Sequence, residues 1–229
     1  MSTMRPGDDA VKPRRAYDAS GRRERAERSR QLIVDAAERR FLGDGYSATT
    51  IATIAADAGV SVDTIYKSFG GKPGLVRAVH ARALEGRGPV PAEQRSDDLQ
   101  AAETDARRIV QGWGALTSEV APRAAPILLL VRTAASTNPE LAALLAELDT
   151  ARLQRMTDNA RRLHRTGQLR PGVTVADAAD VLWTFSSPEL YELLVLRRGM
   201  ALRKYGRFVA DAMIAALLPA AGEAGPQQR

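Results

Sequence analysis

The stretch Thr49–Lys72 reads TTIATIAADAGVSVDTIYKSFGGK and decides how the first third of the chain folds. Its first half repeats apolar side chains at positions i, i+3, i+4 and i+7 from Ile51 to Ala58, the spacing of one face of an α-helix. Gly59 follows in a short turn, and the Ser61 hydroxyl can accept a hydrogen bond from a free backbone N–H at the start of a second helix. The stretch therefore predicts two short helices joined by a glycine turn.

The second helix has two side chains that suit a protein core, Ile65 and Phe69. Its outward-facing side chains are mostly polar, and they are Val62, Asp63, Thr64, Tyr66 and Lys67. Two short helices joined by a tight turn, the second exposing polar groups, are typical of a helix-turn-helix unit that places its second helix in the major groove of DNA. The stretch therefore predicts a sequence-reading DNA-binding element.

Composition places the chain among ordinary globular proteins. Its 229 residues are 45% hydrophobic and 26% charged, enough for one large or two small domains with a core. The absence of cysteine excludes disulfides and thiolate metal sites and favours a reducing compartment. The apolar run 127–131 is too short to cross a bilayer, and the N-terminus lacks the apolar segment of a secretory signal. We therefore predict a cytoplasmic protein that does not enter a membrane.

Charge is distributed unevenly along the chain. Residues 1–84 hold 15 basic and 10 acidic side chains, whereas residues 85–229 hold 18 and 17. Between Lys12 and Arg30 there are eight basic residues against three acidic ones, while Thr49–Lys72 is neutral. Attraction to phosphates is therefore expected to come from the N-terminal arm and first helix rather than from the reading helix. A solvated, disordered tail is the alternative interpretation of the same basic run.

Breaks in the pattern divide the chain into two helical parts. Residues 1–20 mix Pro, Gly, Asp and Arg without periodicity, and GRGPVP at residues 86–91 is the clearest interruption. The predicted segments are a disordered basic arm (1–21), a helix-turn-helix domain (22–86, reader 50–69), a C-terminal domain (92–219) and a disordered tail (220–229).

About nine helices and no strand are expected, which makes the fold class all-α. Thr49 is predicted to cap the first reader helix, and Ser96 is predicted to cap the first helix of the C-terminal domain. Pro122 is expected to open a separate helix, because proline suits the first turn. Ser187-Pro188 is expected to kink or restart the segment that begins with the capping-box pair Thr174 and Asp177.

The segment from Arg28 to about Leu84 resembles the DNA-binding domain of the tetracycline-repressor (TetR) family of bacterial transcriptional regulators. The matching pieces are IVDAAERRFLGDGYSATT, IATIAADAGVS and TIYKSFGGKPGLV, which occur in this order at the family's spacing. They cover about a quarter of the chain. The remainder is similar to the family only in its helical character.

The resemblance implies roles for individual residues. In the reading helix, which Ser61 caps, the residues that would face base edges are Val62, Asp63, Thr64 and Lys67. Thr50, Tyr66 and Lys72 would contact phosphates. Asp63 departs from the family's usual small or basic residue; a carboxylate there can accept from cytosine N4 or lie beside phosphates at an energetic cost. The arm arginines that would reach a flanking minor groove are Arg14, Arg15, Arg22 and Arg23.

The resemblance also implies a homodimer on a near-palindromic double-stranded operator, joined through the last two helices, residues 174–198 and 201–218. An unidentified small-molecule effector would bind in the C-terminal helices and lower operator affinity. The predicted pocket residues are Trp113, Arg132, Met156, Trp183, Phe185 and Tyr191. His164 is a further polar candidate, although its arginine-rich surroundings favour the protein surface.

Other function classes are less consistent with the sequence. The two histidines, His80 and His164, lie far apart, and neither HExxH nor a Gly-rich phosphate loop is present, so we predict no catalytic residues, metal or cofactor. A pure protein-interaction domain does not explain the exposed Thr64, Tyr66 and Lys67. A DNA-binding regulator or activator without a small-molecule effector shares every motif and stays open.

Overall fold

The computed structural model describes residues 19–88 and 90–220, and these residues form helices and no strands. The predicted all-α class is confirmed, with ten α-helices and one π-helix in this part of the chain against about nine helices expected. The N-terminal helices are α1 (Ala19–Asp44), α2 (Ile51–Ala58), α3 (Val62–Phe69) and α4 (Lys72–Glu85). The helices that follow are α5 (Ala92–Ala102), α6 (Ala106–Ala135), α7 (Pro139–Arg165), α8 (Val175–Phe185), α9 (Pro188–Tyr191), the π-helix η1 (Glu192–Arg197) and α10 (Leu202–Leu217).

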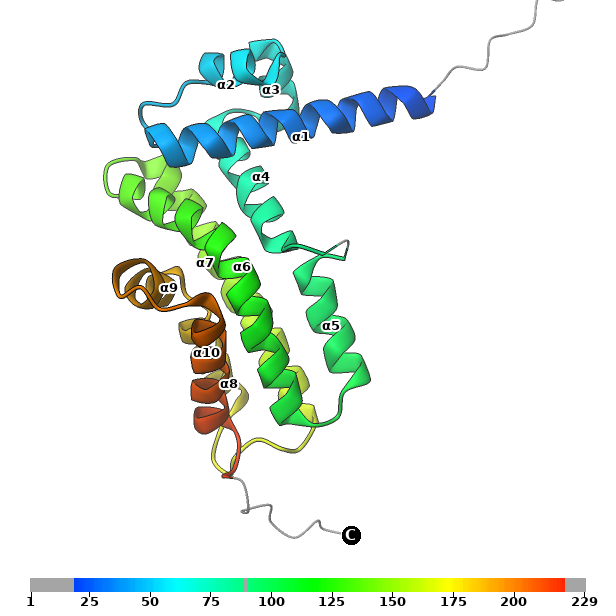
Figure 1. Cartoon of the computed structure of the whole chain (residues 1–229), viewed down its shortest axis with the longest axis vertical. Helices are drawn as coiled ribbons and strands as arrows, with labels where there is room; N and C mark the ends of the chain where they lie inside the picture. The colour runs from blue at the N-terminus through cyan, green and yellow to red at the C-terminus, as the bar shows by residue number, and fades with distance from the viewer. Residues whose placement is uncertain (1–18, 89, 221–229) are drawn as a thin grey trace, which may run out of the picture.

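The N-terminal helices form a head at one end of an elongated molecule (Figure 1). The long α1 lies across this end, α2 packs on it, α3 packs on α2 and α4, and α4 runs away from α1 toward α5. Periodic apolar side chains of all four helices meet in one core, and among its fully buried members are Phe41, Ile54, Ile65 and Leu75. Burial of large apolar side chains, which contributes about 25 cal/mol per Å² of buried surface, is what holds the short helices α2 and α3 in place.

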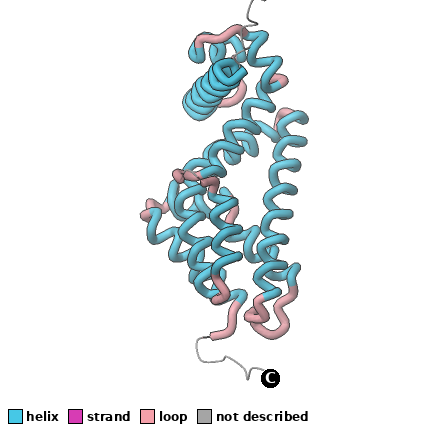
Figure 2. Tube along the Cα trace, turned by 90° about the vertical axis from the view of Figure 1, so that its right-hand side faces the viewer, coloured by secondary structure: helices cyan, strands magenta, loops and turns pink. Residues whose placement is uncertain are grey.

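The remaining helices form a bundle (Figure 2), and its longest members are α6 and α7. α6 packs against α10, α7 and α4, and α7 packs against α8. The head core does not end at α4, since Ile127 and Val131 of α6 and Leu141 and Leu144 of α7 belong to it. The head therefore packs directly against the end of α6 and the start of α7.

α6 corrects the expectation of a helix boundary at Pro122. The helix is continuous from Ala106 to Ala135, with Pro122 and Pro126 inside it. A proline in a helix interior removes a backbone hydrogen bond and costs about 3 kcal/mol or more. Burial compensates for that loss, because the first half of α6 packs in the bundle core and the second half packs in the head core.

The start of α5 also differs from the prediction. The helix begins at Ala92 after Pro91, so Ser96 lies inside it rather than capping it. Ser96 is buried, and its Oγ accepts a hydrogen bond from Trp113 Nε1 at 3.0 Å. The serine satisfies a buried indole N–H instead of a free backbone N–H at a helix start.

The predicted break at Ser187-Pro188 is present. α8 ends at Phe185, and the Ser187 hydroxyl caps α9, which continues into the π-helix η1. The capping box at the start of α8 is also confirmed, with Thr174 N donating to Asp177 Oδ2 at 2.9 Å and Asp177 N donating to Thr174 Oγ1 at 3.1 Å.

Within the described residues, α6 is the one helix long and apolar enough, by length and composition, to cross a membrane. Neither measure takes account of packing. In the structure α6 lies among α4, α7, α9 and α10, as a core helix of a bundle does.

Candidate DNA-binding face and ligand cavity

The reader begins one residue later than expected. Thr50, not Thr49, caps α2: its hydroxyl accepts from Thr53 N at 3.1 Å, and the Thr53 hydroxyl accepts from Thr50 N at 3.2 Å. Thr49 is buried, and its hydroxyl lies within hydrogen-bond distance of Gly45 O (2.7 Å) and Arg40 O (3.1 Å). Thr49 therefore fastens the loop before α2 to the end of α1.

The turn between α2 and α3 follows the sequence prediction. Gly59 adopts the left-handed conformation (φ 66°) that glycine enters without a Cβ clash, and Val60 N donates to Ala55 O. Ser61 then caps α3, its hydroxyl accepting from Thr64 N at 3.1 Å. These short-range contacts set the angle at which α3 leaves α2.

The exposed face of α3 carries both apolar and charged groups. Val62 and Tyr66 are 40% and 53% exposed, whereas Ile65 on the opposite face is fully buried. Lys67 Nζ lies 2.6 Å from Asp63 Oδ2, one helical turn earlier, and both side chains are largely exposed. The reading helix therefore holds its one lysine in an ion pair, which lowers its attraction for phosphate.

Two arginines fasten the reader to the rest of the head. Arg40 of α1 donates two hydrogen bonds to Asp57 of α2, from Nε to Oδ2 at 2.6 Å and from Nη2 to Oδ1 at 2.9 Å. This contact lowers the pKa of the Asp57 carboxyl below its ordinary value. Arg82 of α4 pairs with Asp35 and Glu38 of α1. The pairs hold α2 and α4 at set positions along α1.

Lys72 is not a free cation at the start of α4. Its Nζ donates to Tyr46 O at 2.5 Å and lies 4.1 Å from the centre of the Tyr46 ring. Partial burial lowers the pKa of Lys72. A phosphate contact by this lysine would add to, or replace, a contact inside the head.

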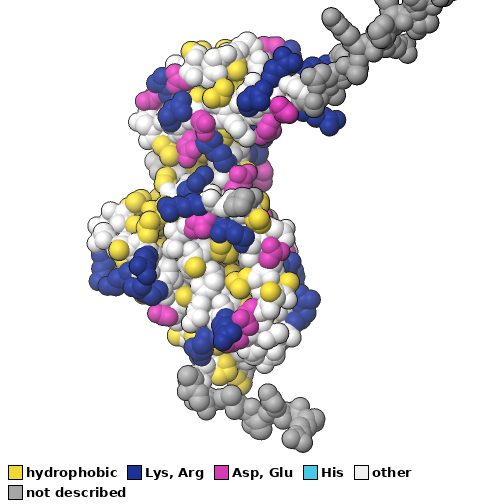
Figure 3. All heavy atoms as spheres, turned by 45° about the vertical axis from the view of Figure 1, so that its right-hand side comes forward, with side chains coloured by type: hydrophobic (Ala, Val, Ile, Leu, Met, Phe, Trp, Pro, Cys, Tyr) yellow, Lys and Arg dark blue, Asp and Glu magenta, His cyan; other side chains and the backbone are white. Residues whose placement is uncertain are grey.

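The basic character of α1 lies on its exposed N-terminal half. Arg22 and Arg23 are helical and exposed, and Arg14 and Arg15 lie outside the described residues. The exposed arginines of this half are Arg22, Arg23, Arg25, Arg28 and Arg30. Figure 3 shows Lys and Arg side chains gathered beside the start of the described chain. Arg30 also lies over the Phe69 ring of α3, 4.7 Å from its centre, so the basic helix and the reader are adjacent.

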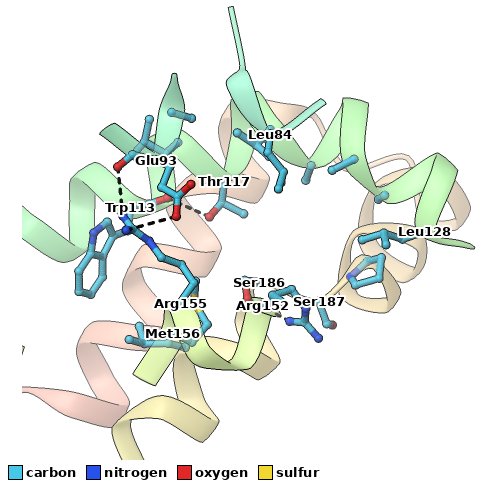
Figure 4. Close-up of a pocket in the computed structure, with 18 of the residues that line it drawn as sticks. Leu84, Glu93, Trp113, Thr117, Leu128, Arg152, Arg155, Met156, Ser186 and Ser187 are labelled. Carbon is cyan, nitrogen blue, oxygen red and sulfur yellow. Dashed lines mark hydrogen bonds and ion pairs between the residues drawn. The ribbon is translucent and has the colours of Figure 1, made fainter. Parts of the chain in front are cut away.

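A cavity of about 360 Å³ lies among α4, α5, α6 and α7, with smaller contributions from α8, α10 and the segment 186–188. Its wall is mainly apolar, and Leu84, Trp113, Leu128 and Met156 are among the lining side chains in Figure 4. The volume falls within the usual range for small-ligand sites. Two of the predicted pocket residues, Trp113 and Met156, line it.

The other predicted pocket residues lie outside the cavity wall. Arg132 pairs with Glu189 and Glu192 and ties α6 to α9 and η1. Tyr191 is buried edge-to-face against a tyrosine of α10. Trp183 and Phe185 are half-buried on α8, and His164 is exposed as expected. These aromatic side chains were predicted from residue type, but the face that each helix turns toward its neighbours decides which of them reach the cavity.

The sequence analysis missed the polar members of the wall, chiefly Arg152 and His80. Arg152 Nη1 donates to Trp183 O at 2.5 Å and to Ser186 Oγ at 3.1 Å, and its guanidinium lies 4.3 Å from the centre of the Trp183 ring. Burial, and secondarily the positive charge of Arg152, lowers the pKa of His80. No local signal in the sequence distinguishes Arg152 from the other arginines of α7, because Arg152 differs from them in being buried by α8.

α4 connects the reader to the cavity. Leu75 and Val76 in its first half are fully buried in the head core, whereas His80 and Leu84 in its second half line the cavity. Arg77 lies between these pairs and donates to Glu147 of α7 through Nε (2.9 Å) and Nη2 (2.6 Å). A molecule in the cavity would touch the same helix that supports the reader.

No group of three or more His, Cys, Asp or Glu side chains able to hold a metal ion occurs within residues 19–88 and 90–220.

Comparison with known proteins places these features in a family. Residues 33–79 match the family model of bacterial regulatory proteins of the tetR family. The uncharacterized HTH-type transcriptional regulator YvkB of Bacillus subtilis (strain 168) is 42% identical over 67 residues, which are 29% of this chain and 35% of YvkB. The matched region thus spans about a third of that relative.

Solved structures extend the likeness in fold to most of the chain. NalD of Pseudomonas aeruginosa, described as the secondary repressor of the MexAB-OprM multidrug efflux pump, superposes with a TM-score of 0.64 at 21% identity, over 86% of this chain and all of NalD. The SmeT–triclosan complex superposes with a TM-score of 0.63 at 24% identity, over 84% of this chain and 92% of SmeT. Residues 33–79, in the N-terminal helices, are therefore similar to the tetR family of bacterial regulatory proteins, and most of the chain shares the fold of these solved structures.

Proposed function

We propose that this protein is a homodimeric transcriptional repressor that binds a near-palindromic operator and is released from it by a small molecule in the cavity. Residues 22–86 would form the DNA-binding domain, and residues 92–219 would bind the effector and the second subunit. The observation that carries the proposal is that one helix, α4, both supports the reader and lines the cavity. As a soluble DNA-binding regulator, the protein would act in the cytoplasm and catalyse no reaction.

The exposed face of α3 is the proposed base-reading surface. Val62 is suited to a thymine methyl group, and Thr64 and Lys67 offer hydrogen-bond donors to base edges. Thr50 and Ser61 at helix starts, together with Tyr66 and Lys72, would bind phosphates, as hydroxyls and helix N-termini commonly do. Asp63 would direct Lys67 along the helix, and the exposed arginines of α1 would add sequence-independent attraction.

Coupling between effector binding and operator binding requires the effector to favour one arrangement of α4 over another. A ligand against His80 and Leu84 would press on the second half of α4, while the Arg77–Glu147 pair and the head core resist its movement. A shift in α4 changes the position of α3 relative to the bundle. In a dimer such a shift changes the separation of the two reading helices, which must match one turn of DNA or a multiple of it.

The proposed dimer surface comprises α8, η1 and α10. Leu193 and Leu196 of η1 are 56% and 54% exposed, and Phe208 of α10 is 41% exposed. Large apolar side chains exposed on the outer helices of a bundle gain stability when a second subunit covers them. NalD, which is described as a repressor, and SmeT, whose structure contains triclosan, are consistent with repression and with a ligand site in this fold.

A regulator or activator without an effector remains the second candidate, because its DNA-binding surface would be identical. The cavity favours the effector-released form, since a bundle without a ligand has no need of about 360 Å³ of mainly apolar space.

Selection from randomised duplexes, followed by a ligand screen, tests the proposal. We expect enrichment of an inverted repeat, and a change of preferred bases when Thr64→Ala or Lys67→Ala replaces the wild-type reader. We also expect compounds that raise the melting temperature of the protein to weaken its affinity for the selected site. Absence of any enriched sequence would contradict DNA reading, and ligands that stabilise the protein without changing DNA affinity would support the effector-independent alternative.

A further inference from the structure

Arg152 is the charged side chain of the cavity wall that the protein itself leaves incompletely paired. Its side chain is 16% exposed, and its nearest carboxylate, Asp149, lies 3.6 Å away and is itself 44% exposed. Arg155, one turn further along α7, contrasts with it, because Arg155 donates to Asp97 Oδ1 at 2.9 Å and lies 3.4 Å from Glu93 Oε1. Of the two arginines in the wall, Arg152 is thus the one with the weaker ion pair, a single contact of 3.6 Å to a half-exposed carboxylate.

The unused donors of Arg152 lie on one edge of its guanidinium. Nη1 donates both of its hydrogen bonds to Trp183 O and Ser186 Oγ. Nε is buried without an acceptor, and Nη2 has only the Asp149 contact at 3.6 Å, beyond hydrogen-bond range. Nε and Nη2 form one side of the planar guanidinium, and a carboxylate binds that side with two parallel hydrogen bonds. A buried donor without an acceptor is unfavourable, so the edge favours a ligand that supplies two oxygens.

The electrostatic surroundings favour a single negative charge. Burial lowers the pKa of Arg152, with Asp149 and Glu189 opposing this only in part, so the guanidinium gains from an added anion. His80 faces the same space, and burial, followed by the charge of Arg152, lowers the pKa of its imidazole, which disfavours a second positive charge there. A dianion would bring a second charge close to Asp149 and to the apolar wall, whereas a monoanion balances one arginine.

The rest of the cavity is suited to an apolar tail. Figure 4 shows Arg152 beside Ser186 and Ser187 on one side, and Trp113 and Met156 on another. Apolar side chains of α6 and α7, such as Val120, Ala124 and Leu148, line the space as well. A flexible chain with a polar group at one end therefore matches the wall better than a ligand that is polar throughout.

We propose that the cavity binds an amphipathic monocarboxylate, with its carboxylate on the Nε/Nη2 edge of Arg152 and its apolar tail toward Trp113 and Met156. This inference rests on the proposed function, because it names the chemical class of the effector of that same site.

A matched series of probes on the purified full-length protein tests the head group. Decanoate, decanol, decylamine and decyl phosphate each contain one saturated ten-carbon chain with a different polar end, and isothermal titration calorimetry without DNA gives their affinities. We expect decanoate to bind at least about tenfold more tightly than decanol, since hydrogen bonds to a charged group provide that discrimination. Equal binding of decanoate and decanol, or tighter binding of decylamine or decyl phosphate, would overturn the assignment.

Two variants test the position of the carboxylate. Arg152→Lys keeps the charge but removes the fork, and we expect it to lose most of the preference for decanoate while binding decanol within about twofold of wild type. Arg161→Lys is the matched control, because Arg161 lies on α7, pairs with Asp158 and does not line the cavity. An unchanged preference in Arg152→Lys would overturn the site. If that variant does not fold, the probe series on the wild type still decides the ligand class.

Separate measurement of operator binding distinguishes this inference from the function on which it rests. Decanoate that binds at Arg152 without weakening operator affinity supports the ligand class and contradicts effector-released repression. Specific operator binding without any decanoate binding supports the regulator and contradicts the ligand class.

Discussion

At the scale of single residues, the Asp63–Lys67 pair sets the charge on the exposed face of α3, the proposed reading helix. The two groups lie 2.6 Å apart on the exposed face of α3, and they neutralise each other there. An exposed pair of this kind contributes little to stability, so its consequence is electrostatic. It explains how a neutral reader can depend on the basic half of α1 for attraction to phosphate.

Replacing Asp63 with Asn should therefore strengthen binding to DNA of any sequence. The change removes a negative charge from the proposed DNA-facing surface and releases Lys67 from its ion pair. We expect the slope of log affinity against log salt concentration to steepen by about one, measured by fluorescence anisotropy. Asp98→Asn, the same charge change on the exposed surface of α5, should leave the slope unaltered. Weaker non-specific binding by Asp63→Asn would show that the carboxylate does not oppose DNA at this position.

His80 gives the protein a stability that depends on pH. Burial and the nearby Arg152 lower the pKa of His80 in the folded state. As pH falls below about 6.5, His80 takes up a proton in the unfolded chain but does not yet do so in the folded chain. The free energy of unfolding should therefore decrease from neutral pH downward until the folded pKa is reached. Urea denaturation as a function of pH measures this decrease, and His80→Gln should remove its His80 component.

His164→Gln provides the control for that experiment, because His164 is exposed near the end of α7 and is the chain's other histidine. This variant should retain the loss of stability seen in the wild type. A pH profile that is unaltered in His80→Gln would place the titrating group elsewhere.

At the scale of helices, the crossing of α6 and α10 depends on two glycines. A Cβ at Gly206 would lie 2.6 Å from Gly114 O and 2.8 Å from Ser118 Cβ. A Cβ at Gly114 would lie 2.5 Å from Gly206 O. Because the nearest obstructing atom is a backbone oxygen in both cases, the helices must move apart to admit a side chain. Glycine here permits close approach, and both residues have ordinary backbone angles.

Gly206→Ala should destabilise the bundle by about 1–3 kcal/mol, the usual effect of overpacking a close contact. Thermal denaturation followed by circular dichroism should show a lower melting temperature. Gly43→Ala is the matched control, since Gly43 is in α1, has no neighbour within 4 Å of the added Cβ and lacks a positive φ. There the alanine should stabilise by roughly 0.5–1 kcal/mol. Equal stability of the two variants would mean that the crossing adjusts freely.

At the scale of the whole molecule, the exposed apolar side chains of η1 and α10 should hold two subunits together. We expect Leu193→Glu to weaken the dimer at least about tenfold in sedimentation equilibrium, because the charge would be buried at the interface. Operator affinity should fall in parallel, since two half-sites are no longer bound together. Leu153→Glu is the control: Leu153 on α7 is 40% exposed and lies outside the proposed interface. A wild-type monomer, or a Leu193→Glu dimer of undiminished affinity, would contradict the proposed interface.

Much of the head could be predicted from the residues alone. The apolar period of α2, Gly59 in its turn, the Ser61 cap and the buried Ile65 all act within a few positions of one another, so the local sequence contains the necessary information. The same holds for the Thr174–Asp177 capping box and for the break before Pro188. Short-range hydrogen bonds and steric limits determine these features whatever surrounds them.

Tertiary contacts decided the rest. Two prolines stay inside α6 because the two cores bury its opposite ends, and Ser96 serves Trp113 instead of a helix start. Lys72 lies against Tyr46, and Arg152 becomes the under-paired cation of the cavity only because α8 packs over it. In each case the partner is distant in the sequence, and burial changes the energy of the same side chain. The residues alone determined the two helices of the reader and the basic N-terminal half of α1 beside them. The packing of α4, α6 and α7 decided where a ligand can bind and which helix it touches.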